Sequence, residues 1–209
     1  MIKLQMLIGS ASYGLSTETS DTDIYIVGSG GYTLPDGRKP HIIRDTKEVY
    51  VQKALLEHRK HPLFLQTLFP AAFLLDTEAA AYIRQTREAV VRAQRKKVYE
   101  AHMEIAEGLL TDAQTWYRAF PKRIAYGIMF YDTVSRYAKG ADFAEAVCPD
   151  DLQRWLLDVR EGKVELGMIL DMIRQKKAAA ETVAAFFDRA QDEAFLQDWK
   201  AGMLGILEE

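Results

Sequence analysis

The chain changes character near residue 70, and this change limits the folds that are open to it. Before that point, short apolar segments lie between turn-rich segments. Ile2–Ile8, Asp23–Val27 and a stretch near His41–Lys47 are predicted to be strands. After about residue 76, apolar residues recur with helical spacing almost throughout. The sequence therefore predicts an α+β protein, with a small mixed β-sheet domain over residues 1–75 and an all-helical domain over residues 76–209.

Capping and breaking residues divide the helical pattern into several predicted helices. Ser, Thr, Asp and Pro favour helix starts, and Gly favours helix ends. Three tryptophans, at positions 116, 155 and 199, match the helical spacing and are expected in the core. On this basis helices are expected at about Glu48–Lys60, Asp76–Leu110, Pro121–Lys139 and Asp150–Arg160, with two more between Val164 and the C-terminus.

Composition argues against several classes of protein. The formal net charge of −3 gives no indication of tight, sequence-independent binding to nucleic acid, although local basic stretches exist. The one cysteine, Cys148, cannot form an intrachain disulfide and is expected to be a small, partly buried side chain. No apolar run approaches the ~18 residues that span a bilayer, and the first residues are predicted to be a strand and not a signal peptide. A cytoplasmic protein without a membrane partner is expected.

Residues 9–23 contain the side chains that most clearly suggest chemistry. Gly9 and Ser10 follow a predicted buried strand, where a glycine lets backbone N–H groups approach an anion closely. Asp21 and Asp23 lie two apart at the start of the next strand and are expected to share one face. Two adjacent carboxylates stay ionised when a cation lies between them, and hard oxygen ligands suit magnesium. A phosphate site beside a magnesium site is typical of phosphoryl or nucleotidyl transfer.

Two other interpretations of this segment compete with the metal site. An Asp-x-Asp sequence by itself can simply form a turn before a strand. The glycines at 9 and 14 also match the first half of a phosphate-binding P-loop, but Leu15 stands where that loop has its lysine. The order strand, Gly-Ser, gap, Asp-x-Asp, strand favours the metal-binding interpretation.

The segment resembles the signature of the DNA polymerase beta-like nucleotidyltransferases, and it is most similar to a bacterial and phage branch of predicted members. The resemblance extends to the segments 61–69 and 156–162, so it covers most of the chain. His61, Gln66 and Ala11 depart from the Asn, Glu and Arg that are usual in the branch. The residues that match its first motif are Gly9, Ser10, Tyr13, Gly14, Ser20, Asp21 and Asp23.

The resemblance implies a two-magnesium transfer of a nucleoside monophosphate from an NTP such as ATP to a hydroxyl acceptor, with release of pyrophosphate. Gly9 and Ser10 would hold the triphosphate, and Asp21 and Asp23 would hold the first metal ion. The family also needs a third carboxylate on the neighbouring strand for the second ion. Asp45 is the preferred candidate, as a metal ligand and as an aid to proton removal, and Glu48 is the competitor. The predicted catalytic residues are therefore Ser10, Asp21, Asp23 and Asp45.

The position of the third carboxylate distinguishes two functions. A complete triad favours an enzyme whose acceptor is unknown and could be RNA. An incomplete triad favours a non-catalytic module that senses a nucleotide or acts as an antitoxin-like partner. The pair His58 and His61 is weighed as half a metal site and set aside. Basic residues at 84–97 and at 122–123 are expected to be solvated, with an RNA track as the alternative.

Overall fold

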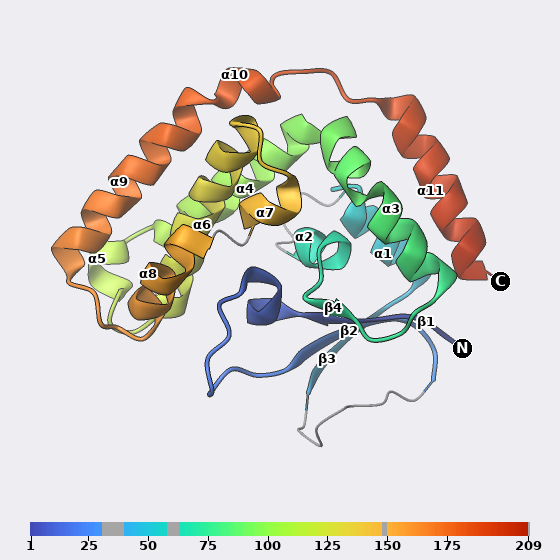
Figure 1. Ribbon diagram of the computed structural model, residues 1–209, viewed down its shortest axis with the longest axis horizontal. Helices are drawn as coiled ribbons and strands as arrows, with labels where there is room; N and C mark the ends of the chain where they lie inside the picture. Colours follow the sequence, from blue (N-terminus) through green and yellow to red (C-terminus); the bar gives the residue numbers. More distant parts are fainter. Residues whose placement is uncertain (31–39, 58–62, 148–149, 209) are drawn as a thin grey trace. The chain divides into compact units, whose positions relative to one another are not determined.

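The computed structural model describes residues 1–30, 40–57, 63–147 and 150–208, and its fold is α+β. The four described strands form one mixed sheet, in the order β3-β2-β1-β4 (Figure 1). Strand β1 is antiparallel to β2 and β4, whereas β2 is parallel to β3. The strand bounds are β1 Ile2–Ile8, β2 Asp23–Gly28, β3 His41–Asp45 and β4 Ala72–Phe73.

The three strands that the sequence predicts are confirmed. The central strand β2 is apolar on both faces, because Ile24, Tyr25, Ile26 and Val27 are all almost fully buried. Such a continuous apolar run is typical of a strand that is buried on both faces. Strand β4 was not predicted, since its two residues are too few to show an alternating pattern.

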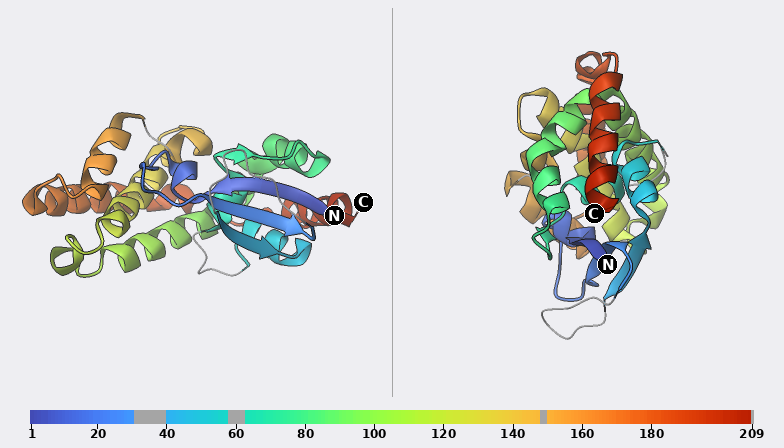
Figure 2. Two further views of the ribbon diagram at one scale, coloured as in Figure 1. Left: turned by 90° about the horizontal axis from the view of Figure 1, so that it is seen from below. Right: turned by 90° about the vertical axis from the view of Figure 1, so that its right-hand side faces the viewer.

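Four of the described α-helices belong to the same compact unit as the sheet (Figures 1 and 2). This unit comprises Met1–Gln94 together with Gln191–Glu209. Helix α11 packs against α3, where Trp199 stacks on Tyr82 with 6.2 Å between ring centroids. The Trp199 indole N–H also donates to the Thr86 hydroxyl at 2.8 Å. The helix bounds are α1 Lys47–Ala54, α2 Leu63–Leu68, α3 Glu78–Ala93 and α11 Glu193–Glu208.

The single long helix expected up to Leu110 is in fact two helices, and this prediction was wrong. Helix α3 ends at Ala93 and α4 begins at Arg95. Between them the Gln94 side chain is buried and donates to the Ala54 carbonyl oxygen at 2.8 Å. This hydrogen bond joins the break between α3 and α4 to the last residue of α1. The division between compact units falls here, between Gln94 and Arg95, whereas the sequence placed a boundary after residue 75.

The second compact unit comprises Arg95–Ala190, and all its described elements are helices. Its centre is α6, most of whose side chains are buried. The buried Asp132 carboxylate of α6 accepts from Lys176 at 2.6 Å and from Arg136 at 2.5 Å. The bounds are α4 Arg95–Leu110, α5 Ala113–Trp116, α6 Pro121–Ala138, α7 Phe143–Val147, α8 Asp150–Arg160, α9 Leu166–Thr182 and α10 Ala184–Phe187.

The tryptophans do not all behave as the helical spacing predicts. Trp199 is buried, as expected, and Trp155 is partly buried. Trp116 is 45% exposed, so its predicted place in the core was wrong. Cys148, predicted to be partly buried, lies outside the described residues. In the part of the chain that the structure describes, no helix combines the length and apolarity that crossing a membrane requires.

The histidine in the core of the second unit makes stability depend on pH. His102 is buried between the rings of Phe130 and Phe143, and its Nδ1 lies 2.6 Å from the Val98 carbonyl oxygen. Burial disfavours the charged imidazolium and lowers the pKa of His102 to about 4, against an ordinary value of 6.5. The folded protein therefore holds His102 neutral over a pH range in which the unfolded chain is protonated.

We expect the free energy of unfolding to fall as the pH drops below 6.5. The unfolded chain then takes up a proton that folded His102 accepts only near pH 4. Between pH 7 and pH 5 the loss should be about 2 kcal/mol, and urea unfolding at the two pH values measures it. The variant His102→Gln should remove this dependence of stability on pH, whereas His41→Gln, at an exposed histidine, should leave the dependence unchanged. An undiminished dependence in His102→Gln would contradict the assignment.

Candidate functional site

The Gly-Ser turn lies directly against the Asp23 carboxylate. Gly9–Tyr13 form a 3-10 helix that follows β1, and the last residue of β1, Ile8, pairs with Asp23 across the sheet. Gly9 has a φ of +75°, and a Cβ at this position would lie 2.1 Å from an Asp23 carboxylate oxygen. Only glycine fits here, because any side chain would collide with the carboxylate. The turn and the first acid of β2, Asp23, therefore lie side by side.

A buried glutamine fixes the position of the turn. The Gly9 N–H donates to the Gln66 side-chain oxygen at 3.2 Å, and the Gln66 amide donates to the Tyr13 hydroxyl at 3.1 Å. The Gly9 N–H is therefore occupied by a side chain of the protein itself. Ser10 itself is only 2% exposed. Gln66 occupies a position where the resembling branch has Glu, and its two-sided hydrogen bonding suits the neutral amide.

The two acids of the Asp-x-Asp motif differ in their surroundings. Asp21 precedes β2 and is exposed, while the Asp23 side chain is 20% exposed. One Asp23 oxygen lies 3.1 Å from Nδ1 of His41, which is also its cross-strand partner on β3. The loop before them is held by Ser20, whose hydroxyl accepts from the Thr17 N–H at 2.7 Å. Both carboxylates are accessible to a ligand from outside.

The register of the sheet separates Asp45 from the acid pair. Asp23 is opposite His41, whereas Asp45 is opposite Val27 at the far end of the parallel pair. Four residues of strand place Asp45 about 13 Å along β3 from the position opposite Asp23. The structure therefore does not bring Asp45 to Asp21 and Asp23 as one metal site. Among the described residues, no group of three or more His, Cys, Asp or Glu side chains is arranged to hold a metal ion.

Asp45 is instead held in a polar cluster at the other end of the sheet. Its carboxylate accepts from the Tyr25 hydroxyl and from the Lys53 ammonium. Lys53 is 8% exposed, and its ammonium lies 5.5 Å from the centroid of the Tyr25 ring. Burial, followed by the hydrogen bond to Asp45, raises the pKa of Tyr25 far above its ordinary range. Tyr25 thus stays neutral, and its hydroxyl donates a hydrogen bond to the Asp45 carboxylate.

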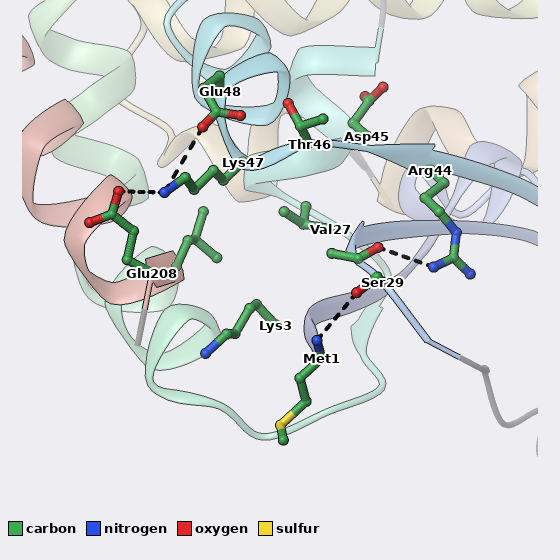
Figure 3. A pocket seen from close by; sticks show the side chains of 12 residues that line it. Met1, Lys3, Val27, Ser29, Arg44, Asp45, Thr46, Lys47, Glu48 and Glu208 are labelled. Atoms are coloured by element: carbon green, nitrogen blue, oxygen red, sulfur yellow. Dashed lines mark hydrogen bonds and ion pairs between the residues drawn. The ribbon is translucent and has the colours of Figure 1, made fainter.

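The competing acid, Glu48, also lies far from the acid pair, in the first turn of α1. A backbone hydrogen bond and the Thr46 side chain lower the pKa of Glu48, so it is a stable anion at a helix N-terminus. Glu48 and Asp45 line one open cavity of about 670 Å³ beyond the ends of β2 and β3. Figure 3 shows Lys47 between Glu48 and Glu208 on its wall. Both candidates for a third carboxylate therefore lie at this cavity.

We expect Asp45→Asn to lower stability without weakening the nucleotide binding that the resemblance implies for the Gly9 turn. The substitution leaves the buried Lys53 ammonium without its carboxylate, at a cost of about 3 kcal/mol. Binding of an NTP at the Gly9 turn should change less than twofold, because Asp45 lies at the other end of β3. Urea unfolding and a nucleotide titration measure the two effects. A large loss of affinity in the folded variant would show that Asp45 belongs to the nucleotide site.

Sequence reasoning missed His41, Gln66, Tyr25 and Lys53 as members of these two clusters. Of these, only Gln66 had a signal, because it departs from the residue usual in the resembling branch. The other three follow from strand register, which local patterns do not reveal. His58 and His61, weighed as half a metal site, lie outside the described residues. Compared with protein-family models, with curated proteins and with solved structures, the chain matches none of them.

Proposed function

We propose that the chain binds a nucleoside triphosphate together with one magnesium ion, as a nucleotide-sensing module of the polymerase beta-like type. The observation that carries the proposal is the contact of Gly9 with the Asp23 carboxylate. Through this contact, a turn that suits phosphate oxygens lies beside a carboxylate that suits a cation. A magnesium–triphosphate complex carries both chemical groups in one ligand.

The donor set fits one magnesium ion. Asp21 is exposed and Asp23 is partly exposed, so both carboxylates can take a cation from solution. Magnesium commonly keeps several waters and uses one or two carboxylates plus phosphate oxygens. Two protein ligands are therefore sufficient for the first ion. A second ion does not fit in the same way, because His41 and not a carboxylate lies opposite Asp23 on β3.

Each residue of the proposed site would have a different role in binding. A magnesium ion held by the acids would neutralise the negative charge of the phosphates. The Ser10 hydroxyl and N–H would donate to a phosphate oxygen at the positive end of the turn. Gln66 and Tyr13 hold that turn in place through the Gly9 N–H. His41 fixes the rotamer of Asp23 through their 3.1 Å contact.

The second candidate function is nucleotidyl transfer itself. It is favoured by the intact Gly-Ser and Asp-x-Asp elements of the sequence and by the closeness of Asp23 to Gly9. In that reaction a hydroxyl oxygen of the acceptor bonds to the α-phosphorus of the NTP. The bond to the bridging oxygen breaks, pyrophosphate leaves and the hydroxyl proton passes to solvent. The binding module is preferred because Asp45 and Glu48 both lie away from the acid pair.

A paired assay separates the two functions. Purified protein is titrated with each of the four NTPs in magnesium, and pyrophosphate release is recorded in parallel with a pool of small RNAs as acceptors. The proposal predicts magnesium-dependent binding without release. Release that requires Asp21 would establish transfer in its place. Absence of binding with all four nucleotides would contradict both candidates.

A further inference from the structure

An exposed aromatic pair with basic neighbours lies on the segment that joins α5 to α6. Trp116 and Phe120 are each 45% exposed, and their ring centroids are 5.7 Å apart. They are four residues apart, so both rings face solvent from one side of the same short segment. Two large aromatic rings side by side at the surface need an explanation, because each leaves apolar area in contact with water.

Basic side chains neighbour this pair in the sequence. Between Ala113 and Arg123 the chain has three basic side chains, Arg118, Lys122 and Arg123, and no acidic one. All three are exposed, and among the described ion pairs none of the three takes part. The Arg123 guanidinium lies 6.0 Å over the Phe120 ring and donates to the Gly108 carbonyl oxygen at 3.1 Å. Elsewhere in the same unit, many exposed cations such as Arg174 and Lys177 are paired with acids.

We propose that this surface, formed by Trp116, Arg118, Phe120, Lys122 and Arg123, binds single-stranded RNA. Unstacked bases offer flat faces that stack on exposed aromatic rings. The phosphates between the bases carry the negative charge that can pair with the three basic side chains. The alternation of rings and cations along the segment matches the alternation of bases and phosphates along a strand. The proposal does not depend on the nucleotide site, since all its residues lie in the second unit.

A lipid surface is the competing partner, and the local structure favours RNA over it. Helices that lie on membranes present a long apolar face. Helix α5 has only four residues, and Phe120 and Pro121 lie at the start of the next helix. The exposed apolar part is limited to two rings with cations between them, which is suited to a few bases and not to a bilayer.

The test is a titration of a fluorescein-labelled 12-nucleotide single-stranded RNA, followed by anisotropy at 50 and 200 mM salt. Trp116→Ala with Phe120→Ala should weaken binding about tenfold or more, since each lost base stack has a large effect. Arg118→Gln with Lys122→Gln should instead reduce the slope of log affinity against log salt by about 1.4. Met168→Ala and Arg154→Gln, exposed residues of the same unit, are the matched controls and should change neither.

Three results would overturn the proposal. The first is no RNA binding by the wild-type protein at 50 mM salt. The second is equal loss in the aromatic and the control variants, each shown to be folded by circular dichroism. The third is binding to phosphatidylserine vesicles that the aromatic substitutions abolish while RNA binding persists, which would assign the surface to membranes. Because NTP binding is measured on the same variants, loss of RNA binding alone leaves the proposed nucleotide site standing.

Discussion

Replacing both Asp21 and Asp23 by asparagine should abolish magnesium-dependent NTP binding, with a loss of affinity of about 100-fold or more. Asparagine keeps the size of each side chain but removes the charge that holds a divalent cation. Without the ion, the triphosphate would meet a site that has no lysine or arginine among the residues assigned to it. The loss should be large because metal and nucleotide bind as one ligand.

The same double variant should remain folded. Asp21 is exposed, and among the described residues Asp23 contacts His41 and the Gly9 turn, so the free energy of unfolding should change by less than about 1 kcal/mol. Asp76→Asn, an exposed acid of the same unit that pairs with Arg84, is the matched control and should bind NTP like the wild type. Full NTP affinity in the folded double variant would contradict the metal-ligand role of the pair.

Gly9→Ala is expected to destabilise the protein by about 3 kcal/mol. Two costs add here, the left-handed backbone conformation at φ +75° and a Cβ that would overlap the Asp23 carboxylate. Gly162→Ala is the matched control, because Gly162 has nearly the same φ, +72°, and a Cβ added there would meet nothing within 4 Å. That control should cost only about 1 kcal/mol. The difference between the two variants measures the contact between turn and carboxylate.

A double-mutant cycle isolates this contact further. In an Asp23→Ala background the carboxylate is gone and only the Asp23 Cβ remains, 3.0 Å from the added methyl group. Gly9→Ala should therefore cost clearly less than in the wild type, while still costing more than Gly162→Ala. Urea unfolding of the four proteins provides the free energies. If Gly9→Ala costs the same with and without Asp23, the carboxylate does not lie against the turn, and the constellation on which the nucleotide site rests is wrong.

Three of the four described strands and the bounds of helices such as α6 and α8 could be predicted from the sequence because their signals are local. Ile2–Ile8 alternates and then becomes apolar, and Pro121 marks the first turn of α6. The closeness of Gly9 to the strand acid was also predictable. A strand, a tight turn and a returning antiparallel strand bring the end of one element beside the start of the next.

The structural features that could not be predicted from the sequence depend on contacts between distant segments of the chain. The register of β3 against β2 decides that His41, and not Asp45, lies opposite Asp23, and a shift of register leaves no trace in either strand alone. The break at Gln94 depends on a hydrogen bond to Ala54, forty residues away. Trp116 has helical spacing, yet α5 ends there after four residues and leaves the ring exposed.

The most direct test of the nucleotide site is a calorimetric titration of the wild-type protein with each NTP, once in magnesium and once in EDTA. The account predicts one site per chain, with an affinity for at least one nucleotide that falls about 100-fold or more when magnesium is removed. Equal affinity in the two buffers, or no heat of binding in either, would contradict a magnesium–nucleotide site at Gly9 and the acid pair.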